Sequence, residues 1–531
     1  MRRWNGWGDE GTERPLSPGA VHLLRDLIGD GTPPNDVQLA DVAANVPPSR
    51  LPHHPLVTTD PEARIRHARG QSLPDWIALR SGRIGAFPDG VALPGNDEEV
   101  REVLAWAARL GAHLIPYGGG TSVVGHINPR RGDRPVVTVD MRRLNQLRRF
   151  DTVSGLATFG AGVSGPALEG RLRAQGYTLG HFPQSFEYST LGGWVATRSS
   201  GQQSLGYGRI ETLFAGGLLE TPAGSIELRP HPASAAGPDL RHLVLGSEGR
   251  LGILTEAIVR VRRLPEQEEF RGVFFPNFAA GEAAIREMVQ ADVPLSLLRL
   301  SSAKETTLTL ALAGHERLLA ASEKALSWRG LGEGKSLLII GYTGTATGVR
   351  RARRSAAHII RRHHGVNLGR ILGDRWRASR FANPYLRNTL WDAGYAVDTW
   401  ETATDWAHVS GLMTAIEDAA LRATLDDRGE QILTFSHISH VYRDGASIYT
   451  TCMFRTDVDP DRTLDRWGRL KAAVVEAILT HGGTITHHHG VGIDHAPYLV
   501  AEKGPLGVAV IGDALRRFDP DGIMNPGKLV P

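Results

Sequence analysis

Cysteine is almost absent from this chain of 531 residues, which contains only Cys452. A single cysteine excludes an intrachain disulfide framework and any zinc or iron–sulfur site built from several cysteines. Long hydrophobic runs are also missing, because no stretch approaches the roughly 18 consecutive apolar residues of a membrane-spanning helix. The N-terminal sequence MRRWNGWGDEG has no apolar segment after its arginines, so we expect no secretory signal. These absences predict a cytoplasmic protein.

A strong charge imbalance is missing as well. The formal net charge is +3, so the chain lacks the basic excess that is typical of proteins that bind nucleic acid. Lysine is scarce, with 6 lysines beside 54 arginines, which is typical of a GC-rich genome. An individual arginine therefore needs local context before it is given a role. The composition, 41% hydrophobic and 22% charged, is that of a folded protein with a large core.

The order of sequence patterns predicts an α+β fold in two lobes. Residues 1–79 are rich in Pro, Asp, Asn and Gly and predict an arm that wraps a larger body, because Trp4 and Trp7 need a surface on which to pack. Residues 80–265 alternate short strands with helices, including one at residues 97–110. Residues 266–510 alternate longer elements, with a helix expected at 315–330 and paired strands around residues 443–445. Residues 511–531 are expected to return to the first lobe.

Three glycine-containing segments of the first lobe follow predicted strands. Glycine lets a backbone approach a ligand closely, and successive N–H groups can bind an anion, although a single such segment is as easily a plain turn. The first of them, PYGGGTS, fits neither the Rossmann nor the P-loop pattern. Three together suit a dinucleotide with two phosphates. The candidate cofactor-binding residues are Pro116, Tyr117, Gly118, Gly119, Gly120, Thr121, Ser122, Gln184, Ser185, Ser189, Thr190, Gly192, Gly193, Thr197, Arg198, Ser199, Ser200, Glu248, Gly249, Leu251, Gly252 and Ile253.

The segments PYGGGTS, QSFEYSTLGGW and GSEGRLGILTEA together resemble the FAD-binding lobe of the p-cresol methylhydroxylase/vanillyl-alcohol oxidase superfamily. The resemblance implies FAD with its pyrophosphate on these segments, in a two-lobe fold whose C-terminal lobe caps the flavin. PYGGGTS contains no histidine, so we expect the FAD to be bound without a covalent link.

A closer resemblance links RWNGWG, GHFPQSFEYSTLGGWVATRSSG, GASIY and HHHGVG to the alkyldihydroxyacetonephosphate synthase family, from Trp4 nearly to Asp519. It implies an ether lipid synthesis in which flavin N5 forms an adduct with acyl-dihydroxyacetone phosphate, the fatty acid leaves and a fatty alcohol adds, without net redox change. It also implies a phosphorylated lipid substrate and a homodimer. The basic segment 350–364 suits a peripheral membrane contact, but a solvated helix face explains it more simply.

The same resemblance assigns roles to particular side chains. Tyr449 matches the acid/base tyrosine, which requires that its surroundings lower its pKa. Arg387 matches the arginine on the substrate phosphate, a role that suits a guanidinium fork, and Arg299 matches a second arginine of the site. The histidines that match the triplet beside the flavin are His487, His488 and His489, of which 487 and 489 would share one face of a strand.

Alternatives to this reaction come from related flavoenzymes. The closing sequence DPDGIMNPGKL resembles FAD-linked 2-hydroxy acid dehydrogenases, which bind a divalent metal through GDGNLH and EHG motifs. Here Tyr449 replaces a histidine of that set and His488 replaces its glutamate, so we expect no metal. His437 and His440 leave a rearranged metal site open. A different substrate in specialised metabolism and a passive flavin-binding protein are the remaining alternatives.

Overall fold

The computed structural model describes residues 1–312, 331–424 and 430–530. It mixes helices with four sheets and is built from two lobes, so the predicted α+β class and two-lobe architecture are confirmed. The helix expected at residues 315–330 lies outside the described residues. None of the helices in the described residues is long and apolar enough to cross a membrane.

The first lobe contains a small sheet in the order β1-β2-β4-β3. β2 and β3 run parallel to β4, and the helix α5 connects β2 to β3. Asn96 caps the start of α5, and Gly111 ends it with φ +61°, which explains why the helix occupies the residues predicted for it. The elements are β1 (Val57–Thr58), β2 (Gly90–Ala92), α5 (Asp97–Leu110), β3 (His113–Tyr117), β4 (Val136–Asp140) and the 3-10 turn η1 (Met141–Arg143).

A second, antiparallel sheet of this lobe has the order β5-β6-β10-β8-β9. Its strands are β5 (Leu147–Asp151), β6 (Leu156–Gly160), β8 (Phe214–Thr221), β9 (Gly224–Leu228) and β10 (Ile253–Arg260). The helices beside it are α6 (Gly165–Arg173), α7 (Leu191–Thr197), α8 (Ser204–Tyr207), α9 (Ile210–Leu213) and α10 (Arg241–Val244). The short strands β7 (Tyr177–Thr178) and β11 (Arg262–Arg263) pair with each other.

The second lobe is built on a seven-stranded antiparallel sheet in the order β15-β12-β14-β13-β17-β18-β16. β17 and β18 form the hairpin that the sequence predicted around residues 443–445. The strands are β12 (Gln267–Phe275), β13 (Leu297–Ser301), β14 (Ser336–Gly344), β15 (Val366–Asn367), β16 (Tyr395–Asp405), β17 (Ile432–Val441) and β18 (Gly445–Arg455).

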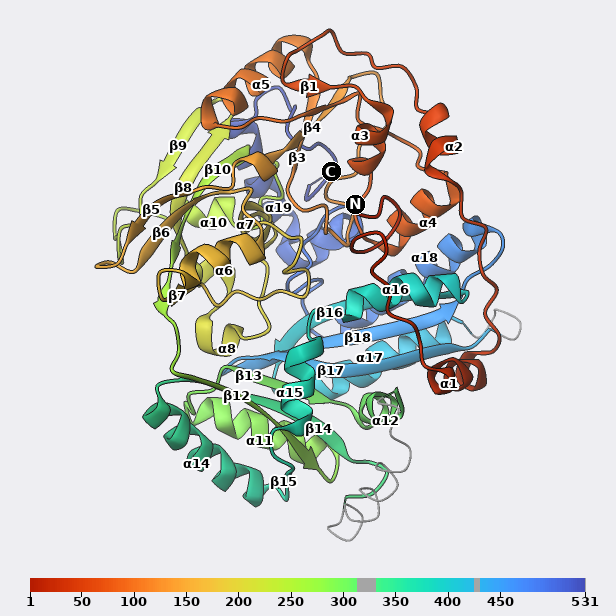
Figure 1. The fold of residues 1–531 in the computed structure, drawn as a ribbon, viewed down its shortest axis with the longest axis vertical. Coiled ribbons are helices and arrows are strands. Elements are labelled where there is room, and N and C mark those ends of the chain that lie inside the picture. The colour runs from red at the N-terminus through yellow and green to blue at the C-terminus, as the bar shows by residue number, and fades with distance from the viewer. Residues whose placement is uncertain (313–330, 425–429, 531) are drawn as a thin grey trace.

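Helices cover both faces of this sheet, because alternate strand residues point to opposite sides. On one face Leu298 and Leu300 pack with α11 (Phe278–Gln290), α14 (Ala346–Arg362), α17 (Val409–Arg422) and α18 (Pro460–Thr480). On the other face, Leu297 and its neighbours pack beneath α12 (Ala303–Leu312) and α15 (Ile371–Ser379), and α16 (Asn383–Asp392) lies farther along. The second face turns toward the first lobe (Figure 1).

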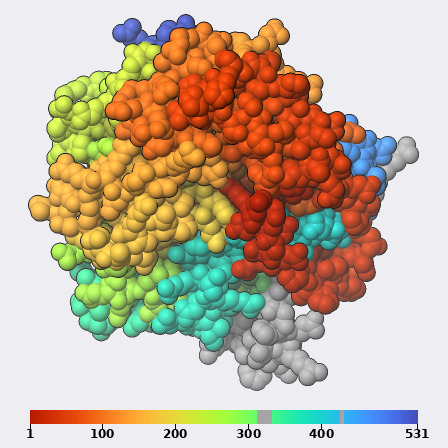
Figure 2. Space-filling view, turned by 45° about the horizontal axis from the view of Figure 1, so that its top comes forward, coloured from red at the N-terminus to blue at the C-terminus, as the bar shows by residue number. Residues whose placement is uncertain are grey.

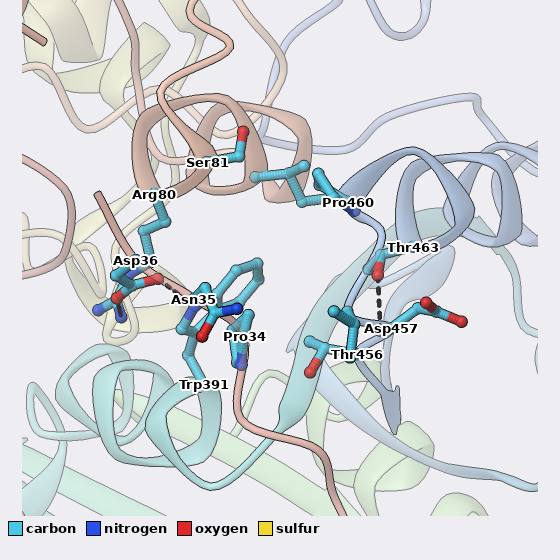
Figure 3. A pocket seen from close by; sticks show the side chains of 12 residues that line it. Pro34, Asn35, Asp36, Arg80, Ser81, Trp391, Thr456, Asp457, Pro460 and Thr463 are labelled. Carbon is cyan, nitrogen blue, oxygen red and sulfur yellow. Dashed lines mark hydrogen bonds and ion pairs between the residues drawn. The ribbon is translucent and has the colours of Figure 1, made fainter.

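The N-terminal segment spreads over both lobes, as the red atoms of Figure 2 show. It contains α1 (Pro18–Ile28), α2 (Leu39–Ala44), α3 (Pro61–Arg66) and α4 (Leu73–Ser81). Arg80 forms an ion pair with Asp36 within this segment at 2.6 Å and joins the segment to the second lobe through Asp392 at 2.9 Å. Trp391 also donates to Asp36, at 3.2 Å (Figure 3).

The C-terminal segment packs on the first lobe. It follows the turn η2 (Ala496–Tyr498) and α19 (Leu499–Phe518), a helix kinked at Gly504 before Pro505. Met524 then makes a parallel bridge to Leu114, and Lys528 donates to the carbonyl of Asn128 at 2.5 Å. The last residues therefore brace the strand that precedes the first glycine segment.

Candidate active site

One cavity of about 850 Å³ has walls from both lobes and collects most of the predicted site residues. From the second lobe, Arg299, Arg387, Tyr449, His488 and His489 line it. From the first lobe, the predicted residues in its wall are Pro116, Tyr117, Gly118, Gly119, Gly120, Thr121, Ser122, Gln184, Ser185, Ser189, Thr190, Gly192, Gly193, Thr197, Ser199, Ser200, Glu248, Gly249, Gly252 and Ile253.

Three predicted residues lie outside this wall. Leu251 is 2% exposed and packs in the core of the first lobe. Arg198 ends α7 with φ +54°, and its guanidinium lies 3.7 Å from Glu211. His487 lies behind His488. The family resemblance placed all three near the ligand, but the direction of each side chain depends on packing that the matching segments do not show.

The first glycine segment packs tightly against the second. A Cβ atom at Gly119 would lie 1.9 Å from the carbonyl oxygen of Tyr188, and one at Gly118 would lie 2.2 Å from Oγ1 of Thr190. Gly120 has φ +65°, which an L-residue with a side chain rarely adopts. The glycines are therefore required, and they leave backbone rather than side chains at the cavity surface.

The cavity also offers a polar group that lacks a partner. Asn525, in the C-terminal segment, donates from Nδ2 to the carbonyls of His126 at 3.0 Å and Glu248 at 2.7 Å. Its Oδ1 atom is buried and accepts no hydrogen bond within the described protein. A buried unsatisfied carbonyl costs about 1–3 kcal/mol, and a donor on a nucleotide would remove that cost. The residues present therefore fit FAD.

Tyr449 lies on the face of the seven-stranded sheet that lines the cavity, which we call the sheet floor. Its strand, β18, runs between β17 and β16, so that His437 and Glu401 are its two cross-strand neighbours. The His437 ring stacks on its phenol with 5.2 Å between ring centres. Burial raises the pKa of Tyr449 to about 12, whereas the sequence analysis required a lowered pKa. The phenol is therefore neutral at physiological pH and carries a proton to donate.

The three histidines lie in a loop between α18 and η2, not in a strand, so that expectation was wrong. We call residues 486–489 the histidine loop. Its backbone turns around the carboxylate of Glu401, which accepts hydrogen bonds from the N–H groups of His487 at 2.6 Å and His489 at 2.9 Å. Sequence reasoning missed Glu401, because its segment, TWETATDW, carries no local motif.

His487 is held by residues that the sequence did not single out. The Tyr442 hydroxyl lies 2.6 Å from its Nε2 atom, and Arg209 donates to its backbone carbonyl at 2.9 Å. Nitrogens of His440, His487 and His488 lie within 4.8 Å of one another, as a metal site would require. The Arg209 guanidinium, however, lies 3.0 Å from Nε2 of His487 and opposes a cation there. The absence of a metal stays a prediction.

The two predicted substrate arginines differ in their surroundings. Arg387, on α16, donates to the carbonyl of Gln71 at 2.7 Å, and its guanidinium lies 4.4 Å from the ring centre of Trp76. Among the described residues no carboxylate forms an ion pair with it. Burial lowers the pKa of Arg387 to about 10, so the group stays charged at neutral pH. This buried cation is available to an anion.

Arg299 is already neutralised by an acidic partner. It donates to Glu305 at 2.7 Å and to Oγ of Ser301 at 2.8 Å, and it lies 3.2 Å from Nδ1 of His437. Burial by itself would raise the pKa of Glu305, but Arg299 and His437 hold it at about 2. Arg299 therefore belongs to a polar network in the sheet floor rather than standing ready for a second anion.

Beyond these polar groups the cavity wall becomes apolar. Its side chains come from the sheet floor and from α12, α15 and α16, which no single sequence pattern brings together. They are Leu297, Leu308, Leu310, Leu337, Ile339, Leu372, Trp376, Leu386, Leu390, Val397, Phe435 and Met453. The cavity thus joins a polar end, suited to a cofactor and a phosphate, to an apolar end.

Comparisons with known proteins agree with the division of the chain into two lobes. Residues 88–228 match the family model described as FAD binding domain, and residues 264–529 match FAD linked oxidases, C-terminal domain. An alkyldihydroxyacetonephosphate synthase from Dictyostelium discoideum is 32% identical over all of this chain and 93% of its own length. The chain belongs to the alkyldihydroxyacetonephosphate synthase family.

A solved structure of an alkyldihydroxyacetonephosphate synthase agrees with this membership. It superposes with a TM-score of 0.85 at 31% identity and covers 99% of both chains. A glycolate oxidase subunit from Bacillus subtilis is more distant, at 26% identity over 84% of this chain. As a member of this family the protein is an FAD-dependent enzyme, and the predicted cofactor is confirmed.

Proposed function

We propose that the enzyme exchanges the acyl group of acyl-dihydroxyacetone phosphate for a fatty alcohol and so makes an ether lipid precursor. The observation that carries the proposal is one cavity in which Tyr449, a long apolar wall and Arg387, which has no carboxylate partner among the described residues, meet the FAD-binding segments. A phosphate, a proton carrier and a hydrocarbon chain are the three parts that this reaction must accommodate. Membership of the family named for this synthesis supports the same conclusion.

The reaction balances without an oxidant. The bond between C1 of dihydroxyacetone phosphate and the ester oxygen breaks, and the fatty acid leaves. The alcohol oxygen then bonds to C1, and the alcohol proton is released. FAD, when bound, supplies the reactive centre that holds the dihydroxyacetone phosphate between these two events.

The protein's own side chains bind the substrate and move its proton. The Arg387 fork suits a bidentate phosphate contact, worth about 1.5–3 kcal/mol for a charged hydrogen bond. The neutral Tyr449 phenol donates its proton to the departing ester oxygen, and the phenolate recovers a proton from the incoming alcohol. The fatty acid then ionises in solution to the carboxylate, which releases the proton that the alcohol supplied. The apolar wall holds each chain by burial, at about 0.8 kcal/mol for every CH₂ group.

Oxidation of a 2-hydroxy acid is the alternative reaction, and the site supports it less than it supports the exchange. A small hydroxy acid has no chain to fill the apolar end of the cavity. The relative that represents this chemistry is also less similar, at 26% identity compared with 32%. We also propose that the enzyme is a homodimer and that it lies in the cytoplasm with a peripheral contact to the membrane. The exposed arginines Arg350, Arg351 and Arg354 of α14 support that contact.

The test supplies the FAD-loaded enzyme, under nitrogen, with palmitoyl-dihydroxyacetone phosphate and radiolabelled hexadecanol. We expect labelled alkyl-dihydroxyacetone phosphate and an equal amount of palmitate. Tyr449→Phe should keep its FAD absorbance and lose both products, because the phenol proton is gone. Reduction of a dye acceptor by D-lactate, with no labelled ether, would instead identify a dehydrogenase.

A further inference from the structure

The Glu401 carboxylate gathers an unusual number of donors for one side chain. Besides the N–H groups of His487 and His489, it accepts from the N–H of His488 at 3.1 Å and from the Thr486 hydroxyl at 2.6 Å. Glu401 is only 4% exposed. Four donors from consecutive residues converge on one buried carboxylate, so the conformation of the histidine loop depends on it.

Glu401 also connects this loop to the strand that carries the phenol. It lies on β16 directly opposite Tyr449 on β18 in the antiparallel register. The Tyr449 ring lies 6.1 Å, between ring centres, from His488 and 6.0 Å from His489. Nδ1 of His488 is 3.4 Å from the carboxylate, and Nδ1 of His489 is 3.7 Å from it. A displaced Glu401 would therefore move both imidazoles relative to the phenol.

We propose that Glu401 is the positioning residue that holds the histidine loop against Tyr449 and supplies the negative charge beside its imidazoles. This inference rests on the proposed function, in which Tyr449 moves the proton. Glu401 acts through the loop and does not line the cavity. Burial lowers the pKa of His488 to about 4 and lowers that of His489 as well, and the Glu401 anion within 3.7 Å opposes this effect, so its removal shifts their titration to still lower pH.

Other titratable groups also face this carboxylate, and each contributes to the charge that an experiment would measure. They are His487, His488 and His489 on the loop, His440 and Tyr442 on and beside β17, Tyr449 on β18 and His495 before η2. Glu401 raises the pKa of each group on the other elements, so its removal moves their titration to lower pH in the same direction as that of the loop imidazoles.

The chain provides a matched control for a purely structural role. Glu169, on α6, is also 4% exposed and accepts from the N–H groups of Leu179 at 2.9 Å and Gly180 at 3.0 Å. The Thr178 hydroxyl also donates to Glu169, at 2.9 Å. Glu169 does not line the cavity, so Glu169→Gln removes a comparable buried clamp from a part of the fold without a site role.

The experiment compares Glu401→Gln, Glu401→Asp and Glu169→Gln in the FAD-loaded enzyme. We expect Glu401→Gln to lower kcat by about 100-fold with little change in KM, since misplacement by about 1 Å costs that much. The acidic limb of its pH–activity profile, which reports the titration of the loop imidazoles, should move to lower pH. Glu401→Asp keeps the charge and should leave that limb in place, although its kcat falls. Glu169→Gln should change neither kcat nor the limb.

An unmoved limb in Glu401→Gln, or equal losses of kcat in Glu401→Gln and Glu169→Gln, would overturn the inference. If Glu401→Gln does not fold, Thr486→Val removes one donor of the loop, and a kcat equal to wild type would overturn it as well. Failure of the proposed function is separate, because the wild-type enzyme would then form no ether.

A further measurement is independent of turnover. Burial by itself would raise the pKa of Glu401, but the histidine loop holds it well below its usual range. Glu401 therefore stabilises the folded state above its unfolded pKa of about 4.3 and loses that contribution as the pH falls. The Tm of wild type should exceed that of Glu401→Gln by a nearly constant amount from about pH 7 to pH 5, and the difference should shrink only below about pH 4, where the buried carboxylate is protonated. A difference that does not shrink below about pH 4 would contradict the charged role.

Discussion

At the scale of single residues, the partners of a side chain distinguish groups that the sequence treats alike. Arg387 and Arg299 are two of 54 arginines, and both line the cavity. Only Arg299 has a carboxylate partner, Glu305, among the described residues. Arg299 and Glu305 are six positions apart in the sequence, but only the fold shows that they form an ion pair. Arg387 has no such partner among the described residues and is therefore available to the phosphate.

The role of Arg387 predicts a selective loss of substrate affinity. Arg387→Ala should raise KM for acyl-dihydroxyacetone phosphate by roughly 10- to 100-fold, because a charged hydrogen bond is worth about 1.5–3 kcal/mol. FAD absorbance should stay near that of wild type. Arg350→Ala, at an exposed arginine of α14, serves as the control. A KM unchanged in Arg387→Ala would exclude the phosphate role.

At the scale of elements, the β17–β18 hairpin presents alternate residues to the cavity. Tyr449, Thr451 and Met453 follow one another along one face of β18 and lead from the phenol to the apolar end. The predicted turn at residues 443–445 sets this hairpin, so the sequence was informative here. It was not informative for the histidine loop, whose conformation depends on Glu401 about 85 positions away.

The face of β18 predicts a limit on chain length. Met453→Trp adds bulk to the apolar wall and should reduce activity with hexadecanol more than activity with octanol, since only the longer chain reaches the obstruction. Met413→Trp makes the same exchange on α17, on the opposite face of the sheet. The ratio of the two activities is the measurement. Equal loss with both alcohols in Met453→Trp would show that the chain takes another path.

At the scale of the whole molecule, the fold class and the two lobes followed from the order of sequence patterns, and FAD followed from the family resemblance that the glycine segments carry. The helix at residues 97–110 did too, through its caps. The apolar wall, the closed Arg299–Glu305 pair and the Glu401 clamp did not, because each joins residues from distant elements. The raised pKa of Tyr449 also arises from burial that a linear motif does not encode.

In the proposed exchange the ester oxygen leaves with the fatty acid, and the alcohol supplies the ether oxygen. The most direct test uses palmitoyl-dihydroxyacetone phosphate labelled with ¹⁸O at the bridging ester oxygen, with unlabelled hexadecanol. Mass spectrometry of both products should find the label entirely in palmitate and none in the alkyl product. Retention of ¹⁸O on the dihydroxyacetone phosphate would mean that the acyl carbon–oxygen bond breaks instead, and would contradict the account.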